Sequence, residues 1–369
     1  MPAEDEEIWM KWALRLAARG RGRTSPNPMV GAVIVRHDDV VGTGWHRKAG
    51  AGHAEAVALA QAGSRAKGST MYVTLEPCAH HGRTPPCVDA IIDAGVSRVV
   101  AAIEDPDPLV SGAGAAALRE AGVEVEFGLL SKAATTLNEE YLVHRREGRP
   151  FVTLKMATSF DGRVAAADGS SQWITCEESR RDAHRLRAQS DAICAGIGTV
   201  LADDPRLTVR EVQVAAPRLR VVVDSTARTP IDSRILSEDA PTLIATALPP
   251  DDERVSVLKK AGAEVLSMAG PDRRVSILHL LHALAGRSVI SLLLEGGPRL
   301  AGCFAAQGMI DRYVFYMAPK LLGERARGSV EGWTAESIDE SRDLRITEFK
   351  RLGSDLKVIA YPVPPEPAG

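Results

Sequence analysis

The segment from His53 to Cys87 constrains the fold more than any other part of this 369-residue chain. It contains one imidazole, His53, and two thiols, Cys78 and Cys87, and the carboxylate of Glu55 follows the imidazole two positions later. Imidazole nitrogens and thiolates are ligands that zinc binds well. Each of these residues is introduced by a turn or by the expected start of a helix. The segment therefore predicts a zinc site built where the chain enters its helices.

The local pattern shows how these side chains can converge. His53 and Glu55 cannot share one face of a regular helix, because residues two positions apart do not face each other. They converge only where the chain enters the helix expected to begin at His53. Cys87 follows two prolines and begins another expected helix, and proline is favoured at a helix start. A helix N-terminus also lowers the pKa of a thiol, which favours the thiolate that zinc requires.

Three protein ligands would leave the fourth zinc position open to water, which is the arrangement of a catalytic zinc. Glu55 would then be the catalytic residue that moves protons without binding the metal, as in zinc-dependent nucleobase deaminases. The alternatives are that the three residues are unrelated, or that His80 or His81 adds a fourth ligand to a closed structural site. A closed site gives Glu55 no function, so the sequence favours a hydrolytic deaminase in the first third of the chain.

Composition limits the classes of protein to which the chain can belong. Hydrophobic residues make up 45% and charged residues 25%, and the net charge is −3. This profile is typical of a soluble globular protein, and the length suggests two domains. Neither half is basic and only 4% of residues are aromatic, so no nucleic-acid partner is expected. The acidic start, the odd number of cysteines and the lack of a long apolar run predict a cytoplasmic protein with no membrane partner.

Strands and helices alternate along both halves of the chain. In the first half the expected strands include 30–36, 70–75 and 98–103, and the expected helices include 6–19, 113–121 and 132–144. The run 145–150 then breaks the pattern and is expected to be a linker. A second alternation begins at Phe151 and ends in an antiparallel pair turned at Gly353 and Ser354. The pattern predicts an α/β protein with two domains, residues 1–147 and residues 148–369.

Two glycine-bearing turns stand out in the second half, at Gly196–Gly198 and at Gly296–Gly297. No G-x-G-x-x-G pattern follows the first strand of this half, so a conventional dinucleotide-binding fold is not expected. Glycines let the backbone approach a phosphate, and the helix start that follows favours negative charge. Such a turn is also common without any ligand. The residues alone leave both interpretations open.

Longer motifs carry a resemblance to a known family. Eight residues separate Cys78 from Cys87, where the usual deaminase signature has two. This insert and the segments Thr24–Val35 and Gly44–Gly50 resemble the deaminase half of the bifunctional riboflavin-biosynthesis deaminase/reductase family. Four further segments resemble the reductase half of that family: 155–163, 171–175, 201–210 and 295–298. The resemblance covers nearly the whole chain, from about Trp9 to Tyr361.

The resemblance implies an N-terminal cytidine-deaminase-like α/β/α sandwich followed by a dihydrofolate-reductase-like α/β domain. It implies a zinc-dependent deamination of 2,5-diamino-6-(5-phosphoribosylamino)pyrimidin-4-one to the corresponding aminouracil. It then implies an NADPH-dependent reduction of the ribosyl to the ribityl side chain. The expected partner is this small pyrimidine ribosyl phosphate, and the chain is expected to form a homo-oligomer.

In the deaminase half, the resemblance implies that Asn27, His46 and His80 contact the substrate. Asn27 lies between two prolines, which fix the backbone and present its amide to a base edge; a turn-stabilising role is the alternative. His80 follows a zinc ligand and is expected to reach the substrate phosphate, or else only the metal ligands. Asp107 stands where the family often has asparagine, which puts any role carried over to it in doubt.

In the reductase half, the family's NADPH contacts correspond to Ala157, Trp173, Thr199, Asp203, Ser225 and the turn that begins at Gly297. Its substrate contacts correspond to Ser171, Arg187, Leu207, Arg210 and Glu295. The two arginines can hold a ribose phosphate, and the glutamate can accept hydrogen bonds from the aminouracil or the sugar. The alternatives are a solvated helix face for Arg187 and core packing for Trp173. Lys155 and Asp161 could position the ribose, although Lys155 could equally be a salt-bridge partner.

Three other functions stay open at this point. The chain could be a zinc deaminase whose second domain is non-catalytic or differently specific. A nucleic-acid-editing deaminase would need a basic groove and stacking rings, which the composition disfavours. A non-enzymatic protein stabilised by zinc would predict that Glu55→Gln changes nothing observable.

Overall fold

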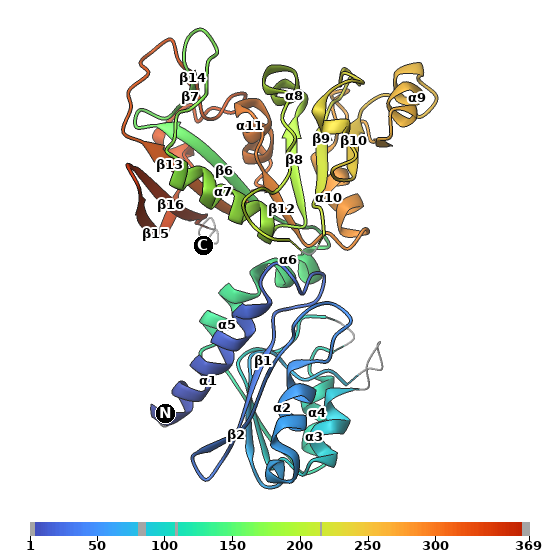
Figure 1. The fold of residues 1–369 in the computed structure, drawn as a ribbon, viewed down its shortest axis with the longest axis vertical. Coiled ribbons are helices and arrows are strands. Elements are labelled where there is room, and N and C mark those ends of the chain that lie inside the picture. Colours follow the sequence, from blue (N-terminus) through green and yellow to red (C-terminus); the bar gives the residue numbers. More distant parts are fainter. Residues whose placement is uncertain (1–3, 80–85, 108–109, 215, 364–369) are drawn as a thin grey trace. The chain divides into compact units, whose positions relative to one another are not determined.

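The computed structural model describes residues 4–79, 86–107, 110–214 and 216–363. The chain divides into two compact units, Met1–Arg149 and Pro150–Gly369, each built around its own β-sheet (Figure 1). In the described part of the chain, no helix combines the length and the apolar character that a membrane span requires.

A five-stranded sheet forms the centre of the first unit, in the order β2-β1-β3-β4-β5. Its strands are β1 (Gly31–Arg36), β2 (Asp39–Trp45), β3 (Thr70–Val73), β4 (Arg98–Ala101) and β5 (Glu124–Phe127). β1 pairs antiparallel with β2 and β3, whereas β3, β4 and β5 run parallel.

Helices cover both faces of this sheet (Figure 1). They are α1 (Glu4–Ala17), α2 (Ala54–Ala62), α3 (Cys87–Asp93), α4 (Ala113–Glu120), α5 (Ser131–Leu137) and α6 (Glu139–Glu147). Alternate residues of β1 face two apolar cores. Ala32 and Ile34 pack with α2, α3 and α4, whereas Val33 and Val35 pack with α1 and α5. These layers confirm the α/β/α sandwich expected for the first half.

The region after α4 differs from the expected single helix over 132–144 followed by a linker. Two helices, α5 and α6, are present, and α6 continues to Glu147. Asn138 separates them, and its side-chain amide bonds both backbone groups of Met29: Oδ1 accepts from the N–H at 2.8 Å and Nδ2 donates to the carbonyl at 2.9 Å. Gly148 ends α6 with φ 66°, a left-handed conformation that glycine adopts at little cost.

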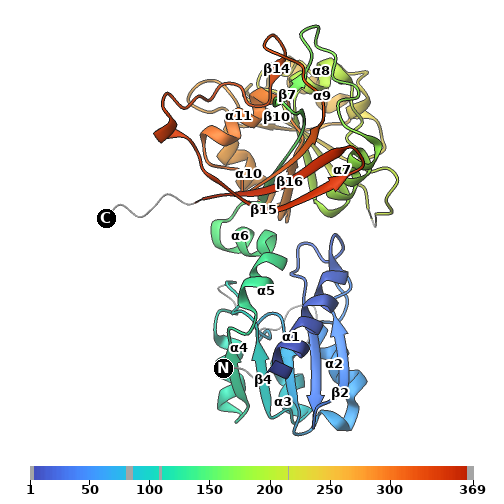
Figure 2. The ribbon, with the colours of Figure 1, turned by 90° about the vertical axis from the view of Figure 1, so that its left-hand side faces the viewer.

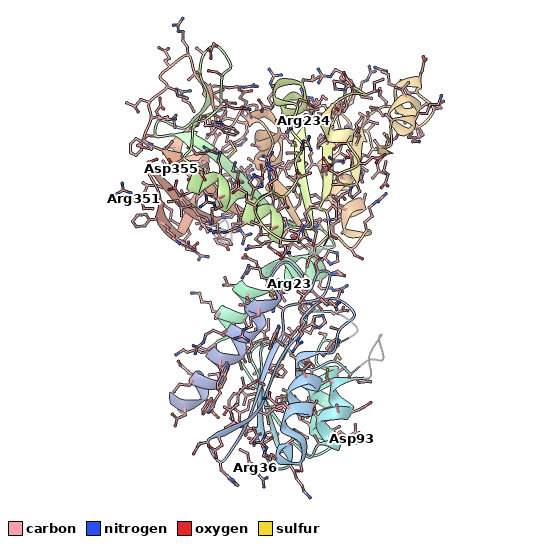
Figure 3. The ribbon with its side chains drawn as sticks, viewed as in Figure 1. Arg23, Arg36, Asp93, Arg234, Arg351 and Asp355 are labelled. Carbon is pink, nitrogen blue, oxygen red and sulfur yellow. The ribbon has the colours of Figure 1, made fainter. Side chains whose placement is uncertain are left out.

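A nine-stranded sheet forms the centre of the second unit, in the order β11-β10-β9-β8-β12-β6-β13-β16-β15. Its strands are β6 (Phe151–Ser159), β8 (Ala192–Gly196), β9 (Leu219–Val223), β10 (Thr242–Thr246), β11 (Glu264–Ser267), β12 (Ser291–Leu294), β13 (Arg312–Ala318), β15 (Leu344–Leu352) and β16 (Asp355–Pro362). Neighbouring strands from β11 to β13 are parallel. β16 and β15 complete the sheet as the expected antiparallel hairpin, and Arg351 and Asp355 flank its turn (Figure 3). β7 (Arg163–Ala165) and β14 (Arg327–Gly328) form a separate two-stranded sheet.

Helices also cover both faces of the second sheet. α7 (Glu177–Gln189), α8 (Ile197–Asp203) and α9 (Glu253–Lys260) pack on one face, and α10 (Ile277–Ala285) and α11 (Pro298–Ala306) pack on the other. In β8, Ala192 and Cys194 face α10 and α11, whereas Ile193 and Ala195 face α8 and α9. The carboxyl ends of the parallel strands meet at one end of the sheet, where α8 and Arg234 also lie (Figure 3).

Candidate active sites

The three expected metal ligands lie together in the first unit. His53 precedes α2, Cys78 follows β3, and Cys87 is the first residue of α3. Nδ1 of His53 lies 3.2 Å from Sγ of Cys87 and 3.5 Å from Sγ of Cys78. The three ligand atoms all lie within 4.8 Å of one another. Two sulfurs and an imidazole nitrogen at this separation form a donor set that fits a single zinc ion.

The surroundings of this group favour the Cys78 thiolate and raise the pKa of the neighbouring carboxyl group. Hydrogen bonds from the Cys87 thiol and from His53 lower the pKa of Cys78 to about 4, so its sulfur is prepared to bind a metal. Glu55 lies in the first turn of α2 and is only 3% exposed. Burial raises the pKa of this carboxyl group. A carboxyl group in such an environment can accept a proton and return it.

Two glycines of β2 set the position of α2. A Cβ atom on Gly44 would lie 2.1 Å from the carbonyl oxygen of Ala54, and one on Gly42 would lie 2.2 Å from that of Ala58. No side chain fits into these gaps, so the helix lies directly against the backbone of the strand. This contact fixes the first turn of α2, and with it the imidazole ligand and the buried carboxyl group.

Asn27 and His46, expected at the substrate, lie beside the metal ligands. The His46 ring meets the His53 ring edge-on, with centroids 5.7 Å apart. With its proton on Nδ1, His46 donates to the Gly52 carbonyl at 3.2 Å and accepts at Nε2 from the Asn27 amide at 3.1 Å. Burial lowers the pKa of His46, which favours this neutral form. His80, the third expected residue, lies outside the described residues.

A buried carboxylate that the sequence analysis missed anchors the segment before Cys78. Glu76 accepts hydrogen bonds from the backbone N–H groups of Asp105, Gly112 and Ala115 at 3.3, 3.1 and 3.1 Å. Its position directly before a proline and an expected metal ligand was the available signal.

Asp107, whose role was in doubt, forms an ion pair with Arg145. The distance between Oδ2 of Asp107 and Nε of Arg145 is 3.4 Å.

In the second unit, four of the expected cofactor residues lie at the carboxyl ends of parallel strands. Ala157 is near the end of β6, Thr199 lies in α8 after β8, Ser225 follows β9, and Gly297 follows β12 at the start of α11. The Gly297 N–H donates to Oγ1 of Thr199 at 3.1 Å. Ligands of open α/β sheets bind at this end of the strands, and the N-terminus of α11 favours a phosphate. These four residues therefore fit NADPH.

Arg187 and Glu295 form a buried ion pair in the same unit. Nε and Nη2 of Arg187 each donate to one carboxylate oxygen of Glu295 at 2.7 Å, and the side chains are 16% and 8% exposed. Although burial opposes ionisation, the Arg187 charge lowers the pKa of Glu295 to about 2. A solvated helix face for Arg187 is therefore wrong. Nη1 donates to the Thr208 carbonyl at 3.0 Å, and the remaining N–H bonds of the guanidinium group can reach a ligand.

Lys155 lies near this pair, in β6. Burial lowers its pKa, and the Glu295 carboxylate opposes this effect. Its ammonium group lies 5.8 Å from the centroid of the Tyr316 ring, and among the described residues it makes no salt bridge.

The Asp161 carboxylate stabilises a loop, because it accepts hydrogen bonds from the backbone N–H groups of Leu322 and Gly323.

His184, a buried residue of α7 that the sequence analysis missed, joins the group. Its Nδ1 accepts a hydrogen bond from the Arg210 N–H at 3.2 Å. Its position three residues before Arg187 was the available signal, because such residues share a helix face. Leu207 is buried in the apolar core beneath α8. The expected substrate residues Arg187, Leu207, Arg210 and Glu295 thus belong to one connected region.

The remaining expected residues lie closer to solvent. Trp173 is 62% exposed, with the guanidinium carbon of Arg180 4.7 Å from its ring centroid, so core packing is wrong for this residue. Asp203, the last residue of α8, is exposed, and Ser171 is half-buried in the segment after β7. Among the described residues, no hydrogen bond links these three to the Arg187–Glu295 pair.

Comparisons with known proteins match both units. The RibD C-terminal domain matches residues 150–358, and the cytidine and deoxycytidylate deaminase zinc-binding region matches residues 3–103. The riboflavin biosynthesis protein RibD of Aquifex aeolicus is 44% identical over 97% of this chain and 99% of its own length. The corresponding protein of Escherichia coli is 42% identical over 95% and 98%.

Solved structures agree with these matches. Acinetobacter baumannii RibD is 38% identical, with a TM-score of 0.89 over 98% of this chain and 99% of that one. The diaminohydroxyphosphoribosylaminopyrimidine deaminase/5-amino-6-(5-phosphoribosylamino)uracil reductase of Thermotoga maritima is 31% identical, with a TM-score of 0.85 over 97% and 99%.

A zinc-binding deaminase region joined to a reductase domain defines a bifunctional enzyme of riboflavin biosynthesis that uses zinc and NADPH. The chain belongs to the RibD family, whose members it matches over nearly their whole length. The second unit is therefore not a non-catalytic scaffold, and the two fold classes implied by the resemblance are confirmed.

Proposed function

We propose that the first unit deaminates 2,5-diamino-6-(5-phosphoribosylamino)pyrimidin-4-one to 5-amino-6-(5-phosphoribosylamino)uracil. The second unit then reduces the ribosyl group of this product to a ribityl chain. The name of the Thermotoga maritima relative states both activities. The observation that carries the proposal is the convergence of His53, Cys78 and Cys87 at the start of a helix that also holds the buried Glu55.

The residues of the first unit divide the chemistry of deamination among them. His53, Cys78 and Cys87 would hold zinc, which would lower the pKa of a bound water molecule. Glu55 accepts a proton from the attacking water and delivers it to the pyrimidine ring nitrogen. It then transfers the second proton of that water to the amino group, which leaves as ammonia. Burial raises the pKa of this carboxyl group, which favours its role as a proton carrier.

The substrate pyrimidine is oriented by side chains next to the metal ligands. His46 accepts one amide hydrogen of Asn27, which fixes the amide and leaves its oxygen and second N–H for the base edge. His80 contacts the substrate phosphate in this proposal, by analogy with the family.

The second unit binds its two substrates at the carboxyl end of the sheet. Ala157, Trp173, Thr199, Asp203, Ser225 and Gly297 would hold NADPH, which would supply the hydride that reduces C1 of the ribose. Ser171, Arg187, Leu207, Arg210 and Glu295 bind the aminouracil ribosyl phosphate. The Arg210 guanidinium group is exposed and has no hydrogen bond or ion pair among the described residues, so it can bind the phosphate. Orientation of cofactor and substrate is the main contribution of these residues.

The deaminase proposal is tested by Glu55→Gln, which keeps the size of the side chain and removes the proton carrier. We expect ammonia release to fall by about 10²- to 10⁴-fold, the usual contribution of a general acid–base group, while the zinc content stays unchanged. Glu120→Gln, at an exposed position of α4, is the matched control. Ammonia release at the wild-type rate by Glu55→Gln would contradict the proposed role of Glu55.

The chain also forms a homo-oligomer in this proposal, through the edge strand β15 (Figure 2). Residues 344–351 of this strand are all exposed, including Ile346 at 65% and Phe349 at 73%. Phe349 lies in one cross-strand row with Val358 and Phe315, so the apolar surface extends over three strands. A long exposed edge with such a surface is suited to pairing with a second copy.

Sedimentation of the full chain tests this association. The wild type should sediment as an oligomer, and Phe349→Lys should shift it toward the monomer without loss of ammonia release. A wild-type monomer at micromolar concentration would rule the association out.

A cytoplasmic location is supported by the five free cysteines, because thiols stay reduced in the cytoplasm. Recovery of the chain outside the cytoplasm on cell fractionation would refute this location.

A further inference from the structure

One face of α7 holds the backbone of the segment that ends in Arg210. Arg187 donates from Nη1 to the Thr208 carbonyl at 3.0 Å, and His184 accepts at Nδ1 from the Arg210 N–H at 3.2 Å. His184 and Arg187 are three positions apart and therefore lie on the same face of the helix. Together they bond a carbonyl and an N–H two residues apart, as a neighbouring strand would.

The other end of this segment is held by Leu207. Its side chain is buried in the core beneath α8, and its φ of 47° lies in the left-handed region. The Arg210 side chain, by contrast, is exposed and makes no hydrogen bond or ion pair with a described residue. The backbone therefore sets where the Arg210 guanidinium group can reach, and the bond to His184 fixes that backbone at Arg210 itself.

We infer that His184 is a positioning residue of the reductase site, which holds Arg210 in place to bind the ribose phosphate by accepting its backbone N–H. The inference rests on the proposed function, in which Arg210 contacts that phosphate. His184 itself need not touch the substrate.

The protonation state of His184 suits this role. Nδ1 can accept only while the ring is neutral, with its proton on Nε2. Burial and the charges of Arg187 and Arg210 lower the pKa of His184 to about 4, whereas Glu295 and Glu211 oppose this shift. The ring is therefore a neutral acceptor near pH 7. An apolar side chain of similar size would fill the same space and leave the Arg210 N–H without a partner.

Three substitutions separate the hydrogen bond from packing. Asparagine places an oxygen near the position of Nδ1, glutamine places its acceptor nearer that of Nε2, and alanine has no acceptor. We expect His184→Ala and His184→Gln to raise the reductase KM for the aminouracil ribosyl phosphate about three- to ten-fold, as for one lost hydrogen bond. His184→Asn should restore KM to within about two-fold of wild type. The effect on kcat should be smaller.

Two controls accompany these variants. The same aminouracil riboside without its phosphate should show no change in KM, because His184 acts through the phosphate contact. Ammonia release by the first unit should stay at the wild-type rate, and an unchanged circular dichroism spectrum should show that the second unit of each variant is folded.

Arg210→Ala distinguishes this inference from the proposed function on which it rests. If Arg210 binds the phosphate, Arg210→Ala raises KM, and adding His184→Ala raises it no further. An effect of His184→Ala that persists beside Arg210→Ala, or that His184→Asn does not restore, overturns the inference. A wild-type KM for Arg210→Ala would instead overturn the phosphate contact, and the inference with it.

Discussion

Two buried carboxyl groups of this chain have pKa values shifted in opposite directions. Burial is the largest effect on Glu55 and raises its pKa, which suits the proton transfer proposed for it. At Glu295 the guanidinium group of Arg187 outweighs burial and lowers the pKa to about 2, which suits a permanent hydrogen-bond acceptor. The environment of each carboxyl group, rather than its residue type, therefore decides its function.

The Glu295–Arg187 pair gives a pH-dependent contribution to stability. The folded-state pKa of Glu295 is about 2, below the value of about 4.3 for an unpaired glutamate. Its stabilisation is therefore fully present above about pH 4.3 and is lost as the pH falls toward 2. Glu295→Gln leaves the Arg187 charge buried without a counter-ion, so we expect the free energy of unfolding at pH 7 to fall by about 3 kcal/mol. The difference from wild type should be smaller at pH 3.

Urea unfolding followed by circular dichroism measures both values. Glu324→Gln, at an exposed position, should match wild type at both pH values. An equal loss for Glu295→Gln at pH 7 and at pH 3 would contradict the ionic origin of the effect.

At the scale of elements, the contact between β2 and α2 links the sheet to the zinc ligands. Because the helix touches the backbone of Gly42 and Gly44 directly, any side chain at these positions must push the helix away. His53 and Glu55 lie at the start of that helix. The geometry of the site therefore depends on two glycines that are neither proposed metal ligands nor proposed substrate contacts.

Gly44→Ala tests this dependence. The added Cβ atom would lie 2.1 Å from the Ala54 carbonyl oxygen, so the helix must shift, at a cost of about 1–3 kcal/mol. We expect weaker zinc binding and slower ammonia release, with unchanged reduction of added aminouracil substrate by NADPH. Gly52→Ala is the matched control, because its Cβ would meet only a methyl group of Val57 at an ordinary 3.7 Å. Full zinc occupancy in Gly44→Ala, measured by elemental analysis, would refute the argument.

At the scale of the whole molecule, each of two compact units carries one of the two proposed sites. The metal ligands and Glu55 belong to the first unit, and the Arg187–Glu295 pair belongs to the second. Each unit has its own apolar cores. The reductase site therefore does not depend on zinc for its structure.

Removal of zinc from the full chain by a chelator tests this independence. Ammonia release should be lost, whereas NADPH oxidation in the presence of the aminouracil ribosyl phosphate should continue at nearly the wild-type rate. Re-addition of zinc should restore ammonia release. Parallel loss of both activities would show that the second site depends on the metal.

Features with a local sequence signal could be predicted from the sequence. Specific contacts between residues far apart in the sequence could not. The convergence of His53 with Cys78 and Cys87 was predictable, because helix starts and prolines are local signals. The break at Asn138 was not, because its partner Met29 lies 109 residues away. Arg187 and Glu295 were expected at the site, but their separation of 108 positions in the sequence hid their pairing. His184 shares a helix face with Arg187, but nothing local indicated its bond to Arg210, 26 residues away. The roles expected in the second unit came from the family resemblance rather than from spacing.

The measurement that tests the central claim most directly is product analysis by mass spectrometry on the zinc-loaded full chain. The chain would be given the diaminopyrimidinone ribosyl phosphate with and without NADPH. The account predicts the deaminated product alone without NADPH, and the deaminated and reduced product only when NADPH is present. Substrate that stays undeaminated, or deaminated product that stays unreduced in the presence of NADPH, would contradict it.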